Sequence, residues 1–495
     1  MTAPLHPLPP RPTPAQIRAL AAELATIGPA AAEQEGFKRE GAECEGAQGG
    51  GGPELLGPLE PGSSPALSAE LQRLSRDCFD YSPVLVPLLE GRCADLVVRA
   101  ASLEQVVRVA GACARHRVPL TLRGAGTGNY GQCVPLQGGV VLDLTGLNRL
   151  RSIDPASGVL EVEAGCGLAA LDQQLARHGR ALRLAPSTYR TATIGGFIAG
   201  GSGGIGSLRW GFLRDPGNLL GLEVVTVEPQ PRVLQLDASA SEPLNHAYGT
   251  NGILTALRLP SCEALAWQQL VVGFGEWQQA LAAARGLLAS ALELNALCLL
   301  EAPITEQLPW PQGCPAPQGE QRLLLLAAPA AIEQLPAWLG ARGGQLLWQA
   351  PQGESRGLPL REFTWNHTTL HWRSHHPDWT YLQMLLPQPE EPCLAALRAR
   401  WGTDLLWHLE GVRHQGAPRL ACLPLLRWQG PEQLAELMAH CRELGAFIFN
   451  PHALTVEDGG LGVIDADQVA AKAAHDPAGL LNPGKLRGWL ERERD

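Results

Sequence analysis

The sequence lacks a long apolar run, an excess of basic residues and a paired-cysteine motif, and each absence excludes a class of protein. No apolar run approaches the roughly 18 residues of a membrane span, and the longest, LLLLAAPAAI, is broken by a proline. The formal net charge is −10, whereas a nucleic-acid partner calls for a basic surface. The twelve cysteines include no CxxC pair, so neither a zinc ribbon nor a disulfide framework is indicated.

No signal peptide is expected either, because the N-terminal MTAPLHPLPPRPTP is too rich in proline to hold an apolar core. The scatter of the cysteines suits a reducing compartment. We therefore expect a cytoplasmic protein, free or peripheral to a membrane, with no transmembrane segment and no nucleic-acid partner.

What is present is a globular chain of several domains. Its 495 residues, of which 45% are hydrophobic, are enough for more than one large core. A helix is predicted over residues 13–28, capped by Thr13 and closed by Gly28, and the glycine- and proline-rich residues 29–66 are expected to be disordered. The expected parts are an N-terminal segment, a first domain, a tryptophan-rich second domain and a C-terminal return to the first, at residues 1–66, 67–260, 261–440 and 441–495.

A strand, a helix and a second strand are predicted near the start of the first domain. ADLVVRA and VPLTLR have strand patterns, and SLEQVVRVAGACARH has a helical one, with Ser102 as N-cap and Gln105 completing a capping box. The glycine-rich RGAGTGNYGQC follows the second strand. Ligands of α/β folds commonly bind at the carboxyl ends of strands, so this loop is a candidate binding site.

Three interpretations of the glycine loop compete, since repeated glycines bring a backbone close to a ligand or allow a tight turn. In a Rossmann loop the ribose ligand would be Asp143, but this residue falls inside a strand and no long helix follows the loop. A Walker A loop would need G-K-[ST], which is absent. A turn that binds nothing is the third interpretation, and a second glycine cluster at 195–206 disfavours it.

Four motifs in order, RGAGTG, APSTYRTATIGG, YGTNGILT and DPAGLLNPGK, are similar to those of the FAD-binding oxidoreductases of the vanillyl-alcohol oxidase type. Within that family, the branch of the glycolate oxidases and D-lactate dehydrogenases is most like this sequence. The resemblance is close over residues 67–260 and the final thirty, and loose between them. It implies an α+β fold, in which a PCMH-type FAD-binding domain of two α/β subdomains is split by an inserted cap of antiparallel sheet and helices.

The resemblance also implies which residues contact FAD. The first loop would bind the pyrophosphate through backbone amides, which bind anions without a lysine. The second motif would follow the flavin and ribityl chain, the third the adenosine, and the last the isoalloxazine edge, where a cation tunes the flavin. The implied residues are Arg123, Gly124, Ala125, Gly126, Thr127, Gly128, Asn129, Pro186, Ser187, Thr191, Thr193, Ile194, Gly195, Gly196, Gly200, Gly201, Ser202, Gly203, Gly204, Gly249, Thr250, Gly252, Ile253, Asn482 and Lys485.

The attachment of the cofactor is expected to be non-covalent. Several relatives bind FAD through a histidine in the first loop, and Thr127 stands at that position here. Others add a cysteine before the second motif's glycine pair, and that position is Tyr189. Neither side chain can form the usual bond, so the FAD should be removable.

The substrate side offers three histidines as candidates for the group that accepts a hydroxyl proton. The related enzymes carry an EHG motif that helps to hold a divalent metal, and this sequence lacks it, so no metal is predicted. The candidates are His367 and His371, whose spacing puts them on one face of a helix or of a strand, and His452. Arg373 and Arg413 could clamp a carboxylate, and ordinary structural roles remain the alternative for all five residues.

One more segment is predicted to face the substrate. WHLEGVRH reads as a strand whose alternate residues would point into the pocket, either His408 and Glu410 or Trp407 and Leu409.

The leading hypothesis is an FAD-dependent oxidoreductase that oxidises a small 2-hydroxy acid, such as D-lactate or glycolate, by hydride transfer to flavin N5. The electron acceptor is open between oxygen, a quinone and a partner protein. One alternative is an enzyme that oxidises a sugar or an aromatic alcohol, favoured by the tryptophan-rich second domain. The other is a flavin-binding subunit of a larger complex that has lost its own activity.

Overall fold

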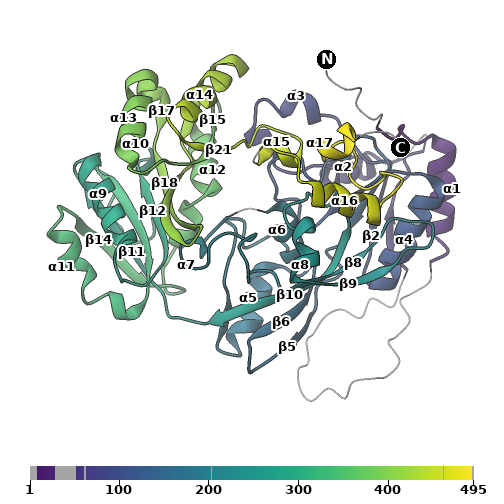
Figure 1. Cartoon of the computed structure of the whole chain (residues 1–495), viewed down its shortest axis with the longest axis horizontal. Helices are drawn as coiled ribbons and strands as arrows, with labels where there is room; N and C mark the ends of the chain where they lie inside the picture. The colour runs from purple at the N-terminus through teal and green to yellow at the C-terminus, as the bar shows by residue number, and fades with distance from the viewer. Residues whose placement is uncertain (1–7, 28–51, 61–62, 202, 461, 493–495) are drawn as a thin grey trace.

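Two lobes lie side by side in the computed structural model, which describes residues 8–27, 52–60, 63–201, 203–460 and 462–492 (Figure 1). The first lobe contains a four-stranded and a six-stranded sheet, and the second is built on an eight-stranded sheet. Helices pack on the sheets of both lobes, so each lobe combines helices and strands, as predicted. Within the described residues, no helix is long and apolar enough to cross a bilayer.

The four-stranded sheet holds the predicted strand, helix and strand. Its strands, in spatial order, are β1 (Glu54–Leu56), β2 (Leu96–Arg99), β4 (Val140–Asp143) and β3 (Leu120–Arg123). β2 and β3 run parallel to β4, and β1 pairs antiparallel with β2. Between β2 and β3 the chain forms α4 (Leu103–His116), whose predicted N-cap Ser102 accepts a hydrogen bond from the Gln105 N–H. The predicted capping box is not formed, because the Gln105 side chain accepts the N–H of Ala101 at 2.7 Å.

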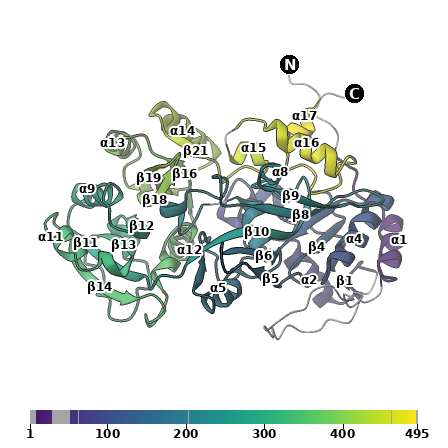
Figure 2. The ribbon, with the colours of Figure 1, turned by 60° about the horizontal axis from the view of Figure 1, so that its bottom comes forward.

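Two N-terminal helices pack beside this sheet. α1 (Pro14–Leu24) begins with the predicted Thr13 cap and packs its apolar face on α4 (Figure 2). α2 (Pro65–Leu74) is capped by Ser64. The expectation that residues 29–66 are disordered is wrong for β1 and for the start of α2, because pairing with a distant strand and a cap order these residues. Residues 28–51, with the expected closing Gly28, lie outside the described residues.

The six-stranded sheet is antiparallel and carries the second and third motifs on its connections. Its strands are β5 (Leu150–Ile153), β6 (Val159–Glu163), β7 (Arg180–Leu182), β8 (Gly221–Val225), β9 (Val233–Asp237) and β10 (Ile253–Glu263). β5 and β6 form an antiparallel hairpin. The helices of this part are α5 (Leu168–Ala176), α6 (Ile194–Gly200), α7 (Ser207–Trp210) and α8 (Ala238–Ser241).

The eight-stranded sheet of the second lobe is antiparallel in every strand pairing. Its strands are β11 (Gln268–Phe274), β12 (Leu294–Leu300), β13 (Gln321–Ala327), β14 (Gln345–Pro351), β16 (Gln383–Leu385), β18 (His408–His414), β19 (Ala417–Cys422) and β21 (Phe447–Phe449). Leucine-rich strands such as β13 are buried on both faces, which is why they read as continuous apolar runs.

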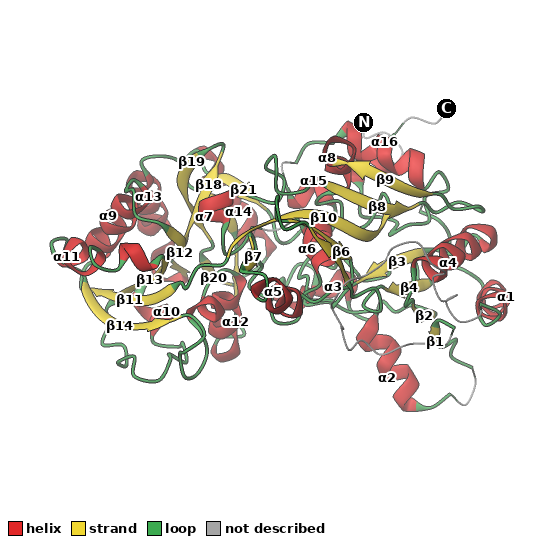
Figure 3. Ribbon diagram, turned by 90° about the horizontal axis from the view of Figure 1, so that it is seen from below, coloured by secondary structure: helices red, strands yellow, loops and turns green. Residues whose placement is uncertain are grey.

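Helices cover both faces of this sheet. α9 (Trp277–Leu288), α13 (Glu390–Trp401) and α14 (Pro431–Glu443) share one apolar core with one face. α12 (Asn366–His375) lies against the opposite face (Figure 3), in a second core that also contains β15 (Trp379–Tyr381). α12 therefore stands between the eight-stranded sheet and the first lobe.

The C-terminal residues lie on the first lobe, as the yellow helices of Figure 1 show. They form α15 (Val456–Gly459), α16 (Ala466–His475) and α17 (Arg487–Glu491). Before α17, the backbone N–H of Asn482 donates to the Leu120 carbonyl at 2.7 Å, so this segment lies alongside β3. The end of the chain is thus fixed next to the strand that leads into the first glycine loop.

Candidate functional site

A cavity of about 490 Å³ lies where α12 faces the glycine-rich segments of the first lobe. Both glycine clusters line it, together with Tyr248 and Gly249 of the third motif. The second lobe contributes Trp365 and His367 at the start of α12 and Gln383 of β16. Ligand pockets of proteins commonly have volumes of about 300–1,000 Å³, so the cavity is large enough for a small molecule or part of a cofactor.

The first glycine loop follows β3 and turns back on Arg123. Gly126 has a φ of +70°, and a Cβ there would lie 2.1 Å from Nη2 of Arg123, so any other residue would strain the backbone and displace the arginine. Arg123 donates to the carbonyls of Arg76 at 2.6 Å and Ala125 at 3.4 Å and is buried. No backbone carbonyl of the described residues accepts a hydrogen bond from the N–H groups of residues 125–129, which leaves these donors for a ligand.

The second glycine cluster begins as a helix, which the sequence did not predict. Thr193 is the N-cap of α6, and its hydroxyl accepts a hydrogen bond from the Gly196 N–H. A Cβ on Gly124 would lie 2.3 Å from the Thr193 hydroxyl oxygen. The two clusters therefore meet, and together they form one wall of the cavity.

Most of the residues implied as FAD contacts line this cavity. Those that do are Arg123, Gly124, Ala125, Gly126, Thr127, Gly128, Asn129, Pro186, Ser187, Thr191, Thr193, Gly195, Gly196, Gly200, Gly203 and Gly249. Those outside its lining are Ile194, Gly201, Gly204, Thr250, Gly252, Ile253, Asn482 and Lys485. Ser202 lies outside the described residues.

Asn482 and Lys485 support the first glycine loop from behind rather than facing the cavity. Lys485 Nζ donates to the carbonyls of Gln132 at 2.9 Å and Val134 at 2.6 Å, and Asn482 also donates to the Gln132 carbonyl, at 2.8 Å. Burial lowers the pKa of Lys485 to about 8, although the neighbouring Cys133 and Asp77 oppose that shift. The lysine thus places a cation beneath the loop.

Asp77 is a lining residue that the sequence did not identify. Its Oδ1 accepts the Phe79 N–H at 3.1 Å, whereas Oδ2 is buried and has no hydrogen-bond partner among the described residues. Burial raises the pKa of this carboxyl to about 6, and Lys485 opposes the shift. Asp77 lies in the unremarkable stretch LSRDCFDY, and only its contact with distant segments buries it.

These features fit a dinucleotide such as FAD. The unpaired amides of the first loop suit phosphate oxygens. The Oδ2 of Asp77, which is buried and unpaired within the described residues, suits a hydroxyl or ring group of such a ligand. Thr127 lines the cavity, while Tyr189 donates its hydroxyl to Asp172 at 2.8 Å and does not line it.

His367 is the candidate histidine that reaches the cavity. Its Nδ1 lies 3.1 Å from Oε2 of Glu362, whose other oxygen accepts Nε of Arg190 at 2.9 Å. Burial raises the pKa of Glu362, but hydrogen bonds from His367 and Arg190 outweigh it and lower the pKa to about 2. A carboxylate that stays ionised therefore orients the imidazole at the cavity wall, an arrangement the sequence did not reveal.

The other two candidate histidines lie elsewhere. His371 is on the same helix, but its Nε2 lies 2.9 Å from the Glu362 carbonyl, its ring packs on Phe363, and burial lowers its pKa. His452 is buried between Ser82 and Tyr381, with each ring nitrogen 2.7 Å from one of them. The structure does not bring the three histidines together at the cavity.

The two arginines considered as carboxylate clamps also lie outside the cavity lining. Arg373 donates to the Trp379 carbonyl at 2.9 Å, and Arg413 to the Gly416 carbonyl at 2.8 Å. Among the described residues that line the cavity, Arg123 and His367 are the only basic ones.

Comparison with known proteins defines the class of the site. Residues 94–235 match a family described as an FAD binding domain. Over 432 residues the chain is 26% identical to glycolate oxidase subunit GlcD of Escherichia coli (strain K12), an alignment that covers 80% of this chain and 84% of that protein. The predicted resemblance is thereby confirmed.

Shorter alignments and a solved structure agree with this result. D-lactate dehydrogenase of Archaeoglobus fulgidus is 34% identical over 152 residues, 30% of this chain and 33% of that protein. The probable mitochondrial D-2-hydroxyglutarate dehydrogenase of Oryza sativa is 30% identical over 182 residues, 34% of this chain and 32% of that protein. The fold is similar to that of alkyldihydroxyacetonephosphate synthase, with a TM-score of 0.61, 15% identity and coverage of 80% and 77%.

The protein is thus an FAD-dependent oxidoreductase, and its cofactor is FAD. Within that class, the chain is similar to proteins named as oxidases and dehydrogenases of glycolate, D-lactate and D-2-hydroxyglutarate.

Proposed function

We propose that the protein oxidises a small 2-hydroxy acid and that His367 accepts the proton of the substrate's hydroxyl group. The observation that carries the proposal is His367, which lines the cavity from the second lobe and is paired with Glu362. The alignments to hydroxy-acid enzymes supply the substrate class.

In this proposal residues 67–260 and 441–495 hold the FAD, and residues 261–440 cover the substrate end. The amides of the first loop would bind the pyrophosphate, and Thr193 and Asp77 would receive hydroxyl groups of the cofactor. FAD bound there supplies the acceptor for the hydride that leaves the substrate carbon. FAD is bound non-covalently, because Thr127 and Tyr189 replace the histidine and the cysteine through which relatives attach it.

His367 is suited to accept the proton because its tautomer leaves the lone pair on Nε2. Glu362 is ionised and lies next to Nδ1, so Nδ1 carries the hydrogen and Nε2 keeps its lone pair. No described residue makes a hydrogen bond to Nε2, which leaves it for the substrate hydroxyl. Glu362 also stabilises the imidazolium that forms, and Arg190 keeps Glu362 in place.

The substrate carboxylate would meet few charged groups. His367 is the basic side chain that the second lobe contributes, and the neutral donors beside it are Asn366, Gln383 and Tyr130. Protonated His367 and these donors would bind the carboxylate after the proton has moved.

A second candidate function follows from the same wall. The absence of a lining arginine or lysine from the described residues of the second lobe, together with Trp365 and Tyr130, favours an uncharged substrate such as a sugar or an aromatic alcohol. A flavin-binding subunit without activity of its own is the third candidate, and the electron acceptor stays open between oxygen, a quinone and a protein.

One experiment separates the three functions. The FAD-loaded protein is mixed anaerobically with glycolate, D-lactate or D-2-hydroxyglutarate, and with neutral analogues such as propane-1,2-diol, while the flavin absorbance is followed. We expect bleaching by at least one acid and none by its neutral analogue. Bleaching by neutral alcohols alone would support the second function, and no bleaching by any substrate the third. Acid precipitation should leave the FAD in solution, and a yellow pellet would contradict non-covalent binding.

A further inference from the structure

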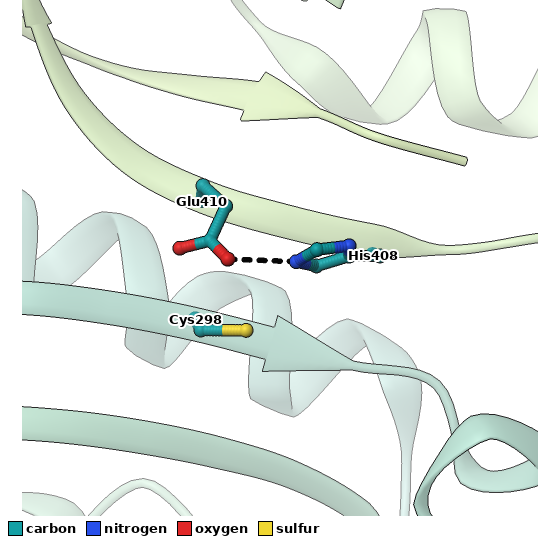
Figure 4. Close-up of side chains that lie close together, drawn as sticks. All are labelled: Cys298, His408 and Glu410. Atoms are coloured by element: carbon teal, nitrogen blue, oxygen red, sulfur yellow. Dashed lines mark hydrogen bonds and ion pairs between the residues drawn. The ribbon is translucent and has the colours of Figure 1, made fainter. Parts of the chain in front are cut away.

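Three chemically reactive side chains meet inside the second lobe, away from the cavity. Cys298 on β12 pairs in register with Glu410 on β18, and His408 lies two residues before Glu410 on the same face (Figure 4). Their exposed fractions are 0%, 1% and 0%. Neither His408 nor Glu410 lines the cavity, so they do not act as the pocket-facing pair that the strand pattern allowed.

Glu410 is the centre of this cluster. Its Oε1 accepts a hydrogen bond from His408 Nε2 at 2.7 Å and from the backbone N–H of Trp365 at 2.6 Å. His408 Nδ1 has no partner within the described residues, which indicates the tautomer with its hydrogen on Nε2. Burial, with the nearby Glu410, raises the pKa of Cys298 well above its usual value, so it remains a thiol.

The hydrogen bond from Trp365 to Glu410 involves a residue with an unusual backbone conformation. Trp365 is the N-cap of α12, and its side chain makes no capping hydrogen bond. Its φ of 53° and ψ of −142° lie in a region that a bulky residue adopts only when its surroundings hold it there. A carboxylate next to the first N–H groups of a helix is favourable, and Glu410, from another strand, accepts the N–H of the cap residue itself.

Glu410 is bonded to a segment that lines the cavity. Trp365, Asn366, His367 and Leu370 all line it from the first turns of α12. The Trp365 indole reaches the second glycine cluster, since a Cβ on Gly203 would lie 2.9 Å from its Cη2 atom. A shift of Trp365 would therefore move both this contact and His367.

We propose that Glu410, oriented by His408, is a positioning residue that fixes the N-terminal end of α12 and thereby sets Trp365 and His367 at the cavity. The ligand atoms of Cys298, His408 and Glu410 lie within 4.8 Å of one another, close enough for a metal ion. His408 Nε2 and Glu410 Oε1 are already joined to each other, and Oε1 also to Trp365, so the contacts favour the structural role. The catalytic consequence rests on the proposed function, whereas the fixing of α12 does not.

Hydrogen–deuterium exchange of the FAD-loaded protein tests the first part. Glu410→Leu removes the acceptor at similar volume and should raise exchange of the α12 amides about tenfold, as expected for a lost cap, while α13 in the same lobe is unchanged. Glu410→Gln keeps an acceptor oxygen and should change α12 less than threefold. Cys298→Ala, a control in the same cluster, should leave α12 unchanged. Equal exchange of α12 in all three variants would overturn the proposal.

Kinetics test the consequence for His367. With a substrate that bleaches the flavin, Glu410→Leu should lower kcat about 10–100-fold and change its pH profile, with FAD affinity kept within twofold. A fall in thermal stability with an unchanged pH profile would mean that Glu410 is only a core residue. If no substrate reduces the flavin, the proposed function fails and the exchange result still decides the role of Glu410.

A second variant covers the case in which Glu410→Leu does not fold. Trp365→Gly removes the backbone strain, so Glu410→Ala, which removes the acceptor, should raise α12 exchange less in that background than in the wild type. Equal effects in the two backgrounds would overturn the proposal.

Elemental analysis of the purified protein completes the test, because one equivalent of metal that is lost in Glu410→Gln would assign the cluster to metal binding instead.

Discussion

At the scale of single residues, Asp77 and His367 are the two titratable groups that the cavity presents most directly. Asp77 offers an unpaired buried oxygen, and His367 offers a ring nitrogen oriented by Glu362. One faces the expected cofactor and the other the expected substrate, so their chemistry can be tested separately.

Replacement of Asp77 by Asn should flatten part of the pH dependence of stability. Burial raises the pKa of this carboxyl from 3.8 to about 6, so the folded apoprotein keeps a proton that the unfolded chain has lost. Stability then falls as the pH rises from about 4 to about 6, by up to about 3 kcal/mol. Thermal unfolding of the apoprotein across this range should show the difference between wild type and Asp77→Asn.

A neighbouring carboxylate provides the control for this measurement. Asp80 also lines the cavity but is exposed, so Asp80→Asn should retain the wild-type pH dependence. If Asp77→Asn and the wild type have the same profile, Asp77 is not a buried acid of the kind described.

A site residue can be predicted from the sequence when a local motif requires it, and not when distant segments create its surroundings. The glycines at 124, 126 and 128 could be identified because a motif requires them locally, and His367 because its residue type is rare and chemically suited. Asp77 and Glu362 could not, because their burial and partners come from segments far away in the chain, such as Lys485 and Arg190.

At the scale of elements, α6 lines the cavity from the first lobe and α12 from the second. Gly203 lies just after α6, where a Cβ would meet the Trp365 indole at 2.9 Å and Phe212 at 3.0 Å. The first lobe and α12 therefore touch at a position that has no room for a side chain.

Gly203→Ala should destabilise the protein by about 1–3 kcal/mol through overpacking and should weaken FAD retention. Gly200→Ala is the matched control, because a Cβ there would meet only Gln132 Nε2 at an ordinary 3.6 Å. That variant should be neutral or about 0.5–1 kcal/mol more stable, since alanine suits a helix. Thermal unfolding of the pair measures the difference in stability, and FAD titration of Gly203→Ala against the wild type measures retention. A Gly203→Ala protein as stable as Gly200→Ala would refute the close contact.

The elements that the sequence predicted are those with local signals. α4 has a cap and a helical period, and β3 and β4 have apolar runs bounded by turns. α6 escaped prediction because its glycines disfavour a helix and the Thr193 cap and packing hold it. β1 escaped because it is ordered only by pairing with β2.

At the scale of the whole molecule, buried hydrogen bonds join the lobes beside the cavity. Asn129 of the first loop donates to the Tyr381 hydroxyl at 2.6 Å. His452 bridges Ser82 and the Tyr381 carbonyl at 2.7 Å each. The C-terminal segment, the first lobe and the second lobe thus meet at β15.

This junction should make the protein sensitive to acid. Burial lowers the pKa of His452 from 6.5 to about 4, so the unfolded chain takes up a proton before the folded protein does. Stability is complete above about pH 6.5 and falls toward pH 4, by up to about 3 kcal/mol for this residue. His452→Gln should lose this part of the pH dependence in thermal unfolding, whereas the exposed His375→Gln should not. An unchanged profile in His452→Gln would rule out this role.

The most direct test of the proposed function is anaerobic single-turnover reduction of the bound flavin in wild type, His367→Gln and His371→Gln. With a hydroxy acid that bleaches the wild type, we expect His367→Gln to reduce the flavin about 10²–10⁴-fold more slowly at unchanged FAD affinity, while His371→Gln stays within tenfold of wild type. Flavin reduction at the wild-type rate in His367→Gln would contradict the role of His367 as the proton acceptor.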